Sequence, residues 1–221
     1  MAPPRLPGNI VLLLIVFIFL AVMVQTGLVR VAFDKLGLSQ SSALLLMFSS
    51  LAGSVINLPL FRITSEPPRP GTLPPLGRFW FFQQLEYHGK TLIALNVGGC
   101  LVPLSFSLYL LTNNPLPPGD ALLGVGVVTI LARIFSRPIS GLGIGMPLFI
   151  APIGAALAAL IINPEQSAPL AYISGTLGVL IGADLLRFKD IRRLGVPLAA
   201  IGGAGTFDGI FISGIVAVLL T

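Results

Sequence analysis

Long apolar stretches occupy most of this chain and constrain its fold more than any other feature. Charged residues make up only 10% of the sequence, and the mean hydropathy is +0.97. A soluble domain carries about 25% charged residues. The sequence therefore predicts an all-α, polytopic integral membrane protein that forms a single domain over residues 1–221.

Seven of these stretches are long enough to cross about 30 Å of hydrocarbon as helices. We expect spans at residues 9–31, 40–61, 91–112, 119–135, 142–162, 168–187 and 196–220. No small-x-small cleavage site follows the first stretch, which therefore predicts an uncleaved span rather than a signal peptide.

The basic residues alternate between the two sides of these spans. All of the 13 except Arg30 and Lys35 fall before the first span or in the second, fourth and sixth loops. Because basic loops stay in the cytoplasm, this pattern predicts the N-terminus inside and the C-terminus outside. The chain is thus expected in a cell membrane as a multi-pass protein.

The longest loop, residues 62–90, begins with a proline-rich piece and ends with an aromatic and basic stretch from Arg78 to Lys90. Aromatic rings beside basic side chains are typical of an amphipathic helix in the headgroup region. Membrane lipids are therefore the expected partner of this loop, and nucleic acid is not.

Two aspartates, Asp184 and Asp208, lie inside the last two predicted spans. A carboxylate at the centre of a membrane costs about 2.5–3.5 kcal/mol on insertion scales, so such residues usually mark a functional site. The count of residues from Arg187 puts Asp184 about one helical turn from the cytoplasmic surface. The two aspartates are the candidate catalytic residues of this chain.

A glycine-rich segment, 202–205, precedes Asp208. Each glycine costs about 1 kcal/mol of helix propensity relative to alanine. We therefore expect the last span to unwind there, with Gly203 and Gly205 in a binding turn and the final helix beginning near Thr206. The spacing of Gly178 with Gly182, and of Gly205 with Gly209, predicts close packing of the last two helices.

Other polar residues are predicted to face the same interior. Ser50, Ser54 and Asn57 recur at helical spacing, and Asn96 precedes a Gly-Gly pair. We take Asn57 and Asn96 as candidate binding residues, because amide side chains inside a membrane contribute to solute and ion sites.

The fourth loop, residues 133–145, is basic and rich in glycine. Such a loop can hold an anion, a phosphate or a lipid headgroup, which makes Arg133 and Arg137 candidate binding residues. Two alternatives stay open. Both arginines can be topology anchors only, and Asp184 can be an interface residue paired with Arg187 or Arg133.

Metal and cofactor sites are not expected. The chain has a single cysteine, Cys100, and a single histidine, His88. These cannot form a disulfide framework, a cysteine-based zinc site or a histidine cluster.

Two motifs, Gly-Ala-Asp-Leu-Leu at 182–186 and the glycine-rich stretch 202–211, resemble an uncharacterised family of archaeal and bacterial polytopic membrane proteins. That family is defined only as a domain of unknown function. The resemblance covers most of the chain and implies a prokaryotic plasma membrane, but no activity.

The same motifs are also similar to the GxGD-type intramembrane aspartyl proteases, such as presenilins, signal peptide peptidases and prepilin peptidases. Those enzymes carry one aspartate near the cytoplasmic end of a helix and another after a glycine-rich turn. This resemblance implies catalytic roles for Asp184 and Asp208. The chain departs from the pattern at Ala183, where the family has tyrosine, and at Thr206, where it has aspartate; no Pro-Ala-Leu motif follows Asp208.

Three functions remain open from the sequence. Transport of an ion, a proton or a small solute is placed first, because it accounts for the asparagines and the glycine-rich break. An aspartyl hydrolase acting on a membrane peptide would use the two carboxyls as general acid and base. The third is a non-catalytic lipid-binding or assembly subunit.

Overall fold

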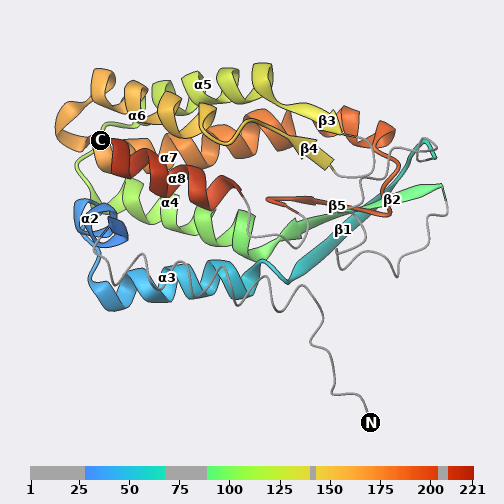
Figure 1. Cartoon of the computed structure of the whole chain (residues 1–221), viewed down its shortest axis with the longest axis horizontal. Coiled ribbons are helices and arrows are strands. Elements are labelled where there is room, and N and C mark those ends of the chain that lie inside the picture. Colours follow the sequence, from blue (N-terminus) through green and yellow to red (C-terminus); the bar gives the residue numbers. More distant parts are fainter. Residues whose placement is uncertain (1–27, 68–88, 140–142, 204–208) are drawn as a thin grey trace, which may run out of the picture.

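A bundle of helices joined to a small sheet forms the fold (Figure 1). The computed structural model describes residues 28–67, 89–139, 143–203 and 209–221. The helices are α2 (Leu28–Lys35), α3 (Gln40–Gly53), α4 (Val102–Asn113), α5 (Pro118–Phe135), α6 (Ile150–Ile162), α7 (Ser167–Val179) and α8 (Gly209–Leu220). Helix α2 lies at the end of the bundle away from the sheet.

Helix α7 is the centre of the bundle. It is buried along its length except at Ser167 and Leu177, and it packs against α4, α5, α6 and α8. It continues through the π-helical segment η5 (Leu180–Leu185), while the 3₁₀ turns η4 (Pro164–Gln166) and η6 (Phe188–Arg193) flank the two segments. Because its whole circumference is covered by protein, α7 has no face of its own toward the surroundings.

The glycines of α7 do allow close packing, but with a different partner from the one predicted. A Cβ at Gly178 would lie 2.5 Å from the Val128 Cβ atom of α5, and Gly182 also packs on the α5 backbone. Contact between α7 and α8 occurs instead at Gly175, whose Cβ would lie 3.5 Å from the Cα of Gly214. The last two helices thus pack closely, as predicted, but through Gly175 and Gly214. Gly178 and Gly182 contact α5 instead, and Gly205 lies outside the described residues.

The sheet has the order β1-β2-β5. Strand β1 (Asn57–Thr64) runs antiparallel to β2 (Lys90–Asn96), which pairs in parallel with β5 (Leu198–Ile201). A small second core, of Ile93, Ile191, Leu194 and Val196, packs against it. A separate short hairpin, β3 (Arg137–Ile139) with β4 (Gly143–Gly145), follows α5.

The prediction of seven continuous spanning helices is wrong. Stretches 40–61, 91–112 and 196–220 each combine a helix with a strand, and stretch 142–162 begins in β4 before α6 starts. Within the described residues, two helices are long and apolar enough to cross a membrane, Pro118–Phe135 and Pro164–Leu185. Hydropathy failed here because a short, continuously apolar strand and an apolar helix score alike.

Two predictions fall largely outside the described residues. These are the first span, 9–31, and the aromatic and basic part of the loop 62–90. The ends of that loop are described, and they belong to strands: Arg62 lies in β1 and Lys90 in β2.

We expect Gly98→Ala to destabilise the fold. A Cβ at this position would collide with the Ser50 carbonyl oxygen and the Ser54 nitrogen, which are backbone atoms that cannot move aside. Overpacking of this kind costs about 1–3 kcal/mol. Thermal aggregation in detergent should show a lower midpoint for this variant. Gly126→Ala, whose Cβ would meet nothing within 4 Å, is the control and should match or exceed the wild type.

Candidate functional site

Two places where a helix meets a strand, and the glycine turn that follows β5, lie together between the bundle and the sheet (Figure 1). We call residues 53–57, 96–100 and 202–203 the junction layer. The Val97 amide donates to the Ile56 carbonyl at 3.0 Å, which ties the first junction to the second. A Cβ at Gly202 would lie 2.6 Å from the Cys100 nitrogen, so the third junction packs directly on the second.

Asn96 holds the junction layer together. Its side-chain nitrogen donates to the Ser54 carbonyl at 2.6 Å and to the Asn57 side-chain oxygen at 3.0 Å. Its side-chain oxygen accepts the Gly99 N–H at 2.7 Å, which caps the π-helical segment η3 (Val97–Leu101). Because both amide hydrogens of this fully buried residue already have protein acceptors, its geometry is that of a structural staple.

The predicted grouping of Ser50, Ser54 and Asn57 is found, but these residues do not form a stripe along one helix. Asn57 is the first residue of β1, so the three do not lie on one helix. They nevertheless gather at the junction layer, where the Ser50 hydroxyl donates to the Gly98 carbonyl at 2.8 Å. The structure thus brings Asn57 and Asn96 together, as expected, on different elements.

Asp184 reaches the junction layer from η5. Its carboxylate accepts the N–H of Gly202 at 2.7 Å, and the residue is partly buried. A backbone N–H aimed at a carboxylate gives a short, charge-assisted hydrogen bond. Asp184 therefore lies beside the glycine-rich turn at which the sequence predicted the last span to unwind.

That turn begins as predicted. Gly202 and Gly203 have φ of 84° and 85°, left-handed values that favour glycine, and the preceding residues form β5 rather than a helix. Gly205 and Asp208 lie outside the described residues. The described chain resumes at Gly209, where α8 begins.

Two π-helical segments lie in or beside the junction layer, and the sequence predicted neither. Segment η3 follows Asn96, and η5 carries Asp184. Such segments are rare and frequently occur at functional sites. Gly98 and Gly182 were a sequence signal for these segments. The close packing that they allow, on Ser50 and on Thr129, was not predictable because it joins parts of the chain that are distant in the sequence.

Arg187 closes the end of α5 beside this site. It donates to the Ser136 hydroxyl at 2.9 Å and to the Arg133 carbonyl at 2.8 Å, and it forms a salt bridge with Asp190 at 3.1 Å. The acidic partner of Arg187 is thus Asp190, and not Asp184 as one of the two alternatives from the sequence suggested. Arg133 and Arg137 keep exposed side chains.

Two hydroxyl groups in the middle of α7 are buried in the bundle. Tyr172 and Thr176 are fully buried, one helical turn apart. Neither hydroxyl oxygen has a hydrogen bond of ordinary geometry within the described part of the chain. Buried hydroxyls are nearly always partnered, so these two need an explanation.

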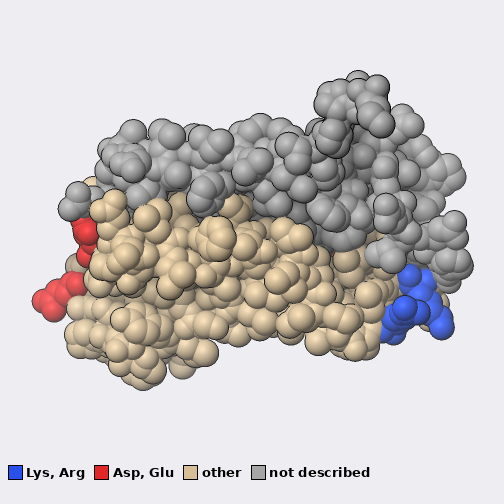
Figure 2. All heavy atoms as spheres, turned by 90° about the horizontal axis from the view of Figure 1, so that it is seen from below, with Lys and Arg blue, Asp and Glu red and all other residues tan. Residues whose placement is uncertain are grey.

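Charged side chains gather at opposite ends of the molecule. Figure 2 shows basic residues at one end and acidic residues at the other, with neither on the described flank between them. The basic end, which includes the sheet and the β3–β4 hairpin, carries Arg62, Lys90, Arg133, Arg137, Lys189, Arg192 and Arg193. At the other end, a polar pocket of about 410 Å³ contains Asp34, Lys35 and Glu165.

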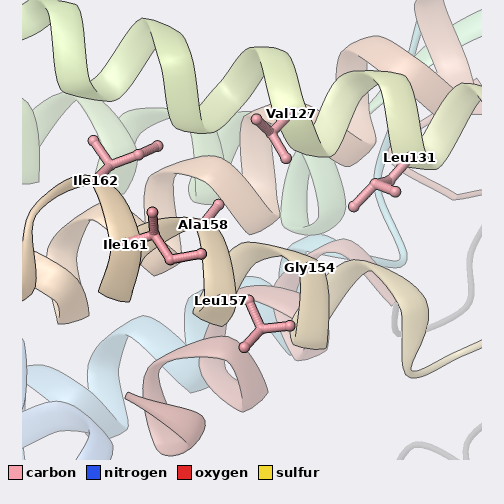
Figure 3. Close-up of a pocket in the computed structure, with 7 residues that line it drawn as sticks. All are labelled: Val127, Leu131, Gly154, Leu157, Ala158, Ile161 and Ile162. Carbon is pink, nitrogen blue, oxygen red and sulfur yellow. The ribbon is translucent and has the colours of Figure 1, made fainter.

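An apolar groove of about 300 Å³ runs between α5 and α6 (Figure 3). Its lining includes Leu131, Gly154 and Leu157 and is aliphatic throughout. It offers nothing to a polar ligand. Among the described residues, no group of three histidine, cysteine, aspartate or glutamate side chains could hold a metal ion.

A family model described as a protein of unknown function, DUF1614, matches residues 51–220. The match includes the junction layer and Asp184. No curated protein and no solved structure matches the chain.

We expect Asn96→Ala to lower stability strongly, because it removes three hydrogen bonds and leaves the Ser54 carbonyl without this donor. Each lost partner of a buried group costs about 1–3 kcal/mol. Thermal aggregation in detergent measures the loss. Asn113→Ala, which removes exposed side-chain contacts only, is the control. An Asn96 variant with unchanged stability would contradict the structural role and favour ligand binding.

Proposed function

The chain belongs to the DUF1614 family, whose description assigns no activity, and we propose from the geometry that it is a multi-pass membrane protein that passes a small cation or proton along α7 by way of Asp184. The hydrogen bond between the Asp184 carboxylate and Gly202 carries this proposal, because it puts an acidic group at a break in the fold.

Exposed apolar side chains support a membrane environment. They cover the outer faces of α3, α4, α5 and α6, where Leu45, Leu122 and Ile161 are 66%, 74% and 81% exposed. Soluble proteins rarely expose contiguous apolar surface on this scale. Helix α5 is about 27 Å long at 1.5 Å per residue, close to the thickness of the hydrocarbon core.

The position of the basic residues supports an orientation. Basic residues gather at the sheet end, so we place that end in the cytoplasm and the polar pocket around Glu165 outside. The membrane is that of the cell, and a prokaryotic plasma membrane fits the resemblance of the sequence motifs.

The polar groups of α7 support permeation. This helix is shielded from lipid and carries, from the outer end inward, Ser167 at the polar pocket, the hydroxyls of Tyr172 and Thr176, and then η5 with Asp184. Transporters place their sites where discontinuous helices expose backbone inside the protein. The junction layer has three such discontinuities.

An aspartyl hydrolase is the second candidate. The specific observation in its favour is that the glycine turn preceding Asp208 in the sequence bonds to Asp184. A lipid-binding or assembly subunit is the third, supported by the apolar flank alone.

We expect Asp184→Asn to lower cation or proton flux at least about tenfold, because asparagine can still accept from Gly202 but carries no charge. Purified chain in liposomes, loaded with a pH dye and driven by a potassium diffusion potential, measures proton entry; a sodium-sensitive dye measures the cation. Asp190→Asn, in the same region but salt-bridged to Arg187, is the control and should retain flux. A wild-type chain that passes neither species contradicts the proposal.

The hydrolase is tested with the same chain. If the two carboxyls act together, Asp184→Asn and Asp208→Asn should each abolish cleavage of a membrane peptide, and the double variant should be no worse. A disulfide that forms readily between cysteines placed at 184 and 208, in a Cys100→Ser background, would favour this function over permeation.

The orientation predicts opposite labelling at the two ends. In the Cys100→Ser background, a membrane-impermeant maleimide should label Glu165→Cys on intact cells, because that exposed position faces outward. Arg137→Cys should react only after the membrane is opened. The reverse pattern would overturn the assigned orientation.

A further inference from the structure

The two buried hydroxyl-bearing side chains of α7 lie against α8. A Cβ at Gly214 would be 2.7 Å from the Thr176 Oγ1 atom and 2.9 Å from the Tyr172 Cδ2 and Cε2 atoms. Tyr172 and Thr176 are four residues apart, a spacing that puts both side chains on one face of a helix. The two side chains therefore share one place in the bundle, where α7 contacts α8.

The surroundings of this place are apolar. The Phe106 ring of α4 meets the Tyr172 ring edge to face, with centroids 4.9 Å apart and planes at 78°. The sequence of α7 has no charged residue, and its Ser174 hydroxyl already donates to the Leu170 carbonyl. Tyr172 and Thr176 are fully buried, and neither oxygen has a hydrogen bond of ordinary geometry among the described residues. Each hydroxyl therefore keeps its capacity to donate and to accept.

Two neutral oxygens cannot replace the hydration shell of a metal ion. A protein site for Ca²⁺ supplies about six to eight oxygen ligands, and an ion stripped of water in an apolar interior is costly. A proton has a different requirement. Because a hydroxyl has one hydrogen to donate and two lone pairs that accept, it can receive a proton on one side and release its own on the other. The pair is therefore suited to a proton and not to a metal cation.

We propose that the species passed along α7 is the proton, and that the hydroxyls of Tyr172 and Thr176 relay it past α8 toward Asp184. The inference rests on the proposed function and names its substrate class. Thr176 is eight residues before Asp184, about 12 Å at 1.5 Å per residue, so water molecules carry the proton over the rest of the path.

Each transfer conserves the hydroxyl group. The incoming proton bonds to a lone pair of the oxygen, and the original hydrogen leaves for the next acceptor, which is a water or the other hydroxyl. One O–H bond forms and one breaks at the same oxygen, so the group is neutral again afterwards. Rotation about the C–O bond then restores its orientation, and no oxidant or other reactant is needed.

Removal of either hydroxyl should lower flux without lowering stability. Tyr172→Phe and Thr176→Val nearly keep the shape of each side chain and delete a group that has no hydrogen bond of ordinary geometry. The midpoint of thermal aggregation in detergent should therefore stay the same or rise. Proton entry into liposomes should fall about tenfold in each variant, the effect of one lost hydrogen bond.

Ser174→Ala is the matched control. It removes a buried hydroxyl from the same helix, but one that is bonded to the Leu170 carbonyl, and it should leave proton entry unchanged. A lower midpoint for Tyr172→Phe or Thr176→Val would mean that the hydroxyl is structural and would overturn the relay. Proton entry equal to that of the wild type in either variant would overturn it as well.

The wild-type chain identifies the transported species. Proton entry should slow when water is replaced by heavy water, because each transfer breaks an O–H bond, and a sodium-sensitive dye should report no entry. Sodium entry at the rate of the proton, or an equal proton rate in heavy water, contradicts the relay and leaves permeation by way of Asp184 standing. Entry of neither species contradicts the proposed function itself, so the two failures are distinguishable.

Discussion

Backbone groups inside an apolar interior must find hydrogen-bond partners, and in this protein that requirement is most demanding where helices turn into strands. At each turn the helical ladder stops before the sheet ladder begins. Asn96 supplies donors and an acceptor to this gap, Ser50 supplies another donor, and Asp184 receives the Gly202 N–H. The bundle and the sheet can be one unit because these groups are satisfied by each other rather than by water.

Glycine allows those partners to approach. Gly98 lies directly on the last turn of α3, and Gly202 lies on the backbone of residues 99 and 100. A side chain at either place would separate the three junctions and leave their polar groups without partners. The stability of the junction layer therefore requires close approach of the three backbones, because its hydrogen bonds form only at the short distances that glycine permits.

Sequence reasoning found some of these elements and missed others for physical reasons. Stretch 119–135 became α5 almost to the residue, because it carries no charge between Asp120 and Arg133 and is bounded by Pro118 and Ser136. Stretch 40–61 failed because Asn57 fits helical spacing from Ser50 while belonging to a strand. The glycine turn before Asp208 was predictable from the low helix propensity of glycine. Asp184 was identified because a carboxylate inside an apolar stretch is costly. The role of Asn96 in joining the first two junctions was not predictable, because the acceptors of its side-chain nitrogen, on Ser54 and Asn57, lie about 40 residues away.

The outer faces of the bundle are apolar, which is unusual for a soluble protein. The most enclosed helix, α7, contains buried hydroxyls, while Leu122 on α5 and Ile161 on α6 face outward. In water this arrangement would lose stability twice, by exposing apolar surface and by enclosing the hydroxyls of Tyr172 and Thr176, which have no hydrogen bond of ordinary geometry among the described residues. In lipid the first loss becomes a gain, and the second persists at Tyr172 and Thr176. Under the proposed function, these two hydroxyls lie on the path of the polar species that α7 passes.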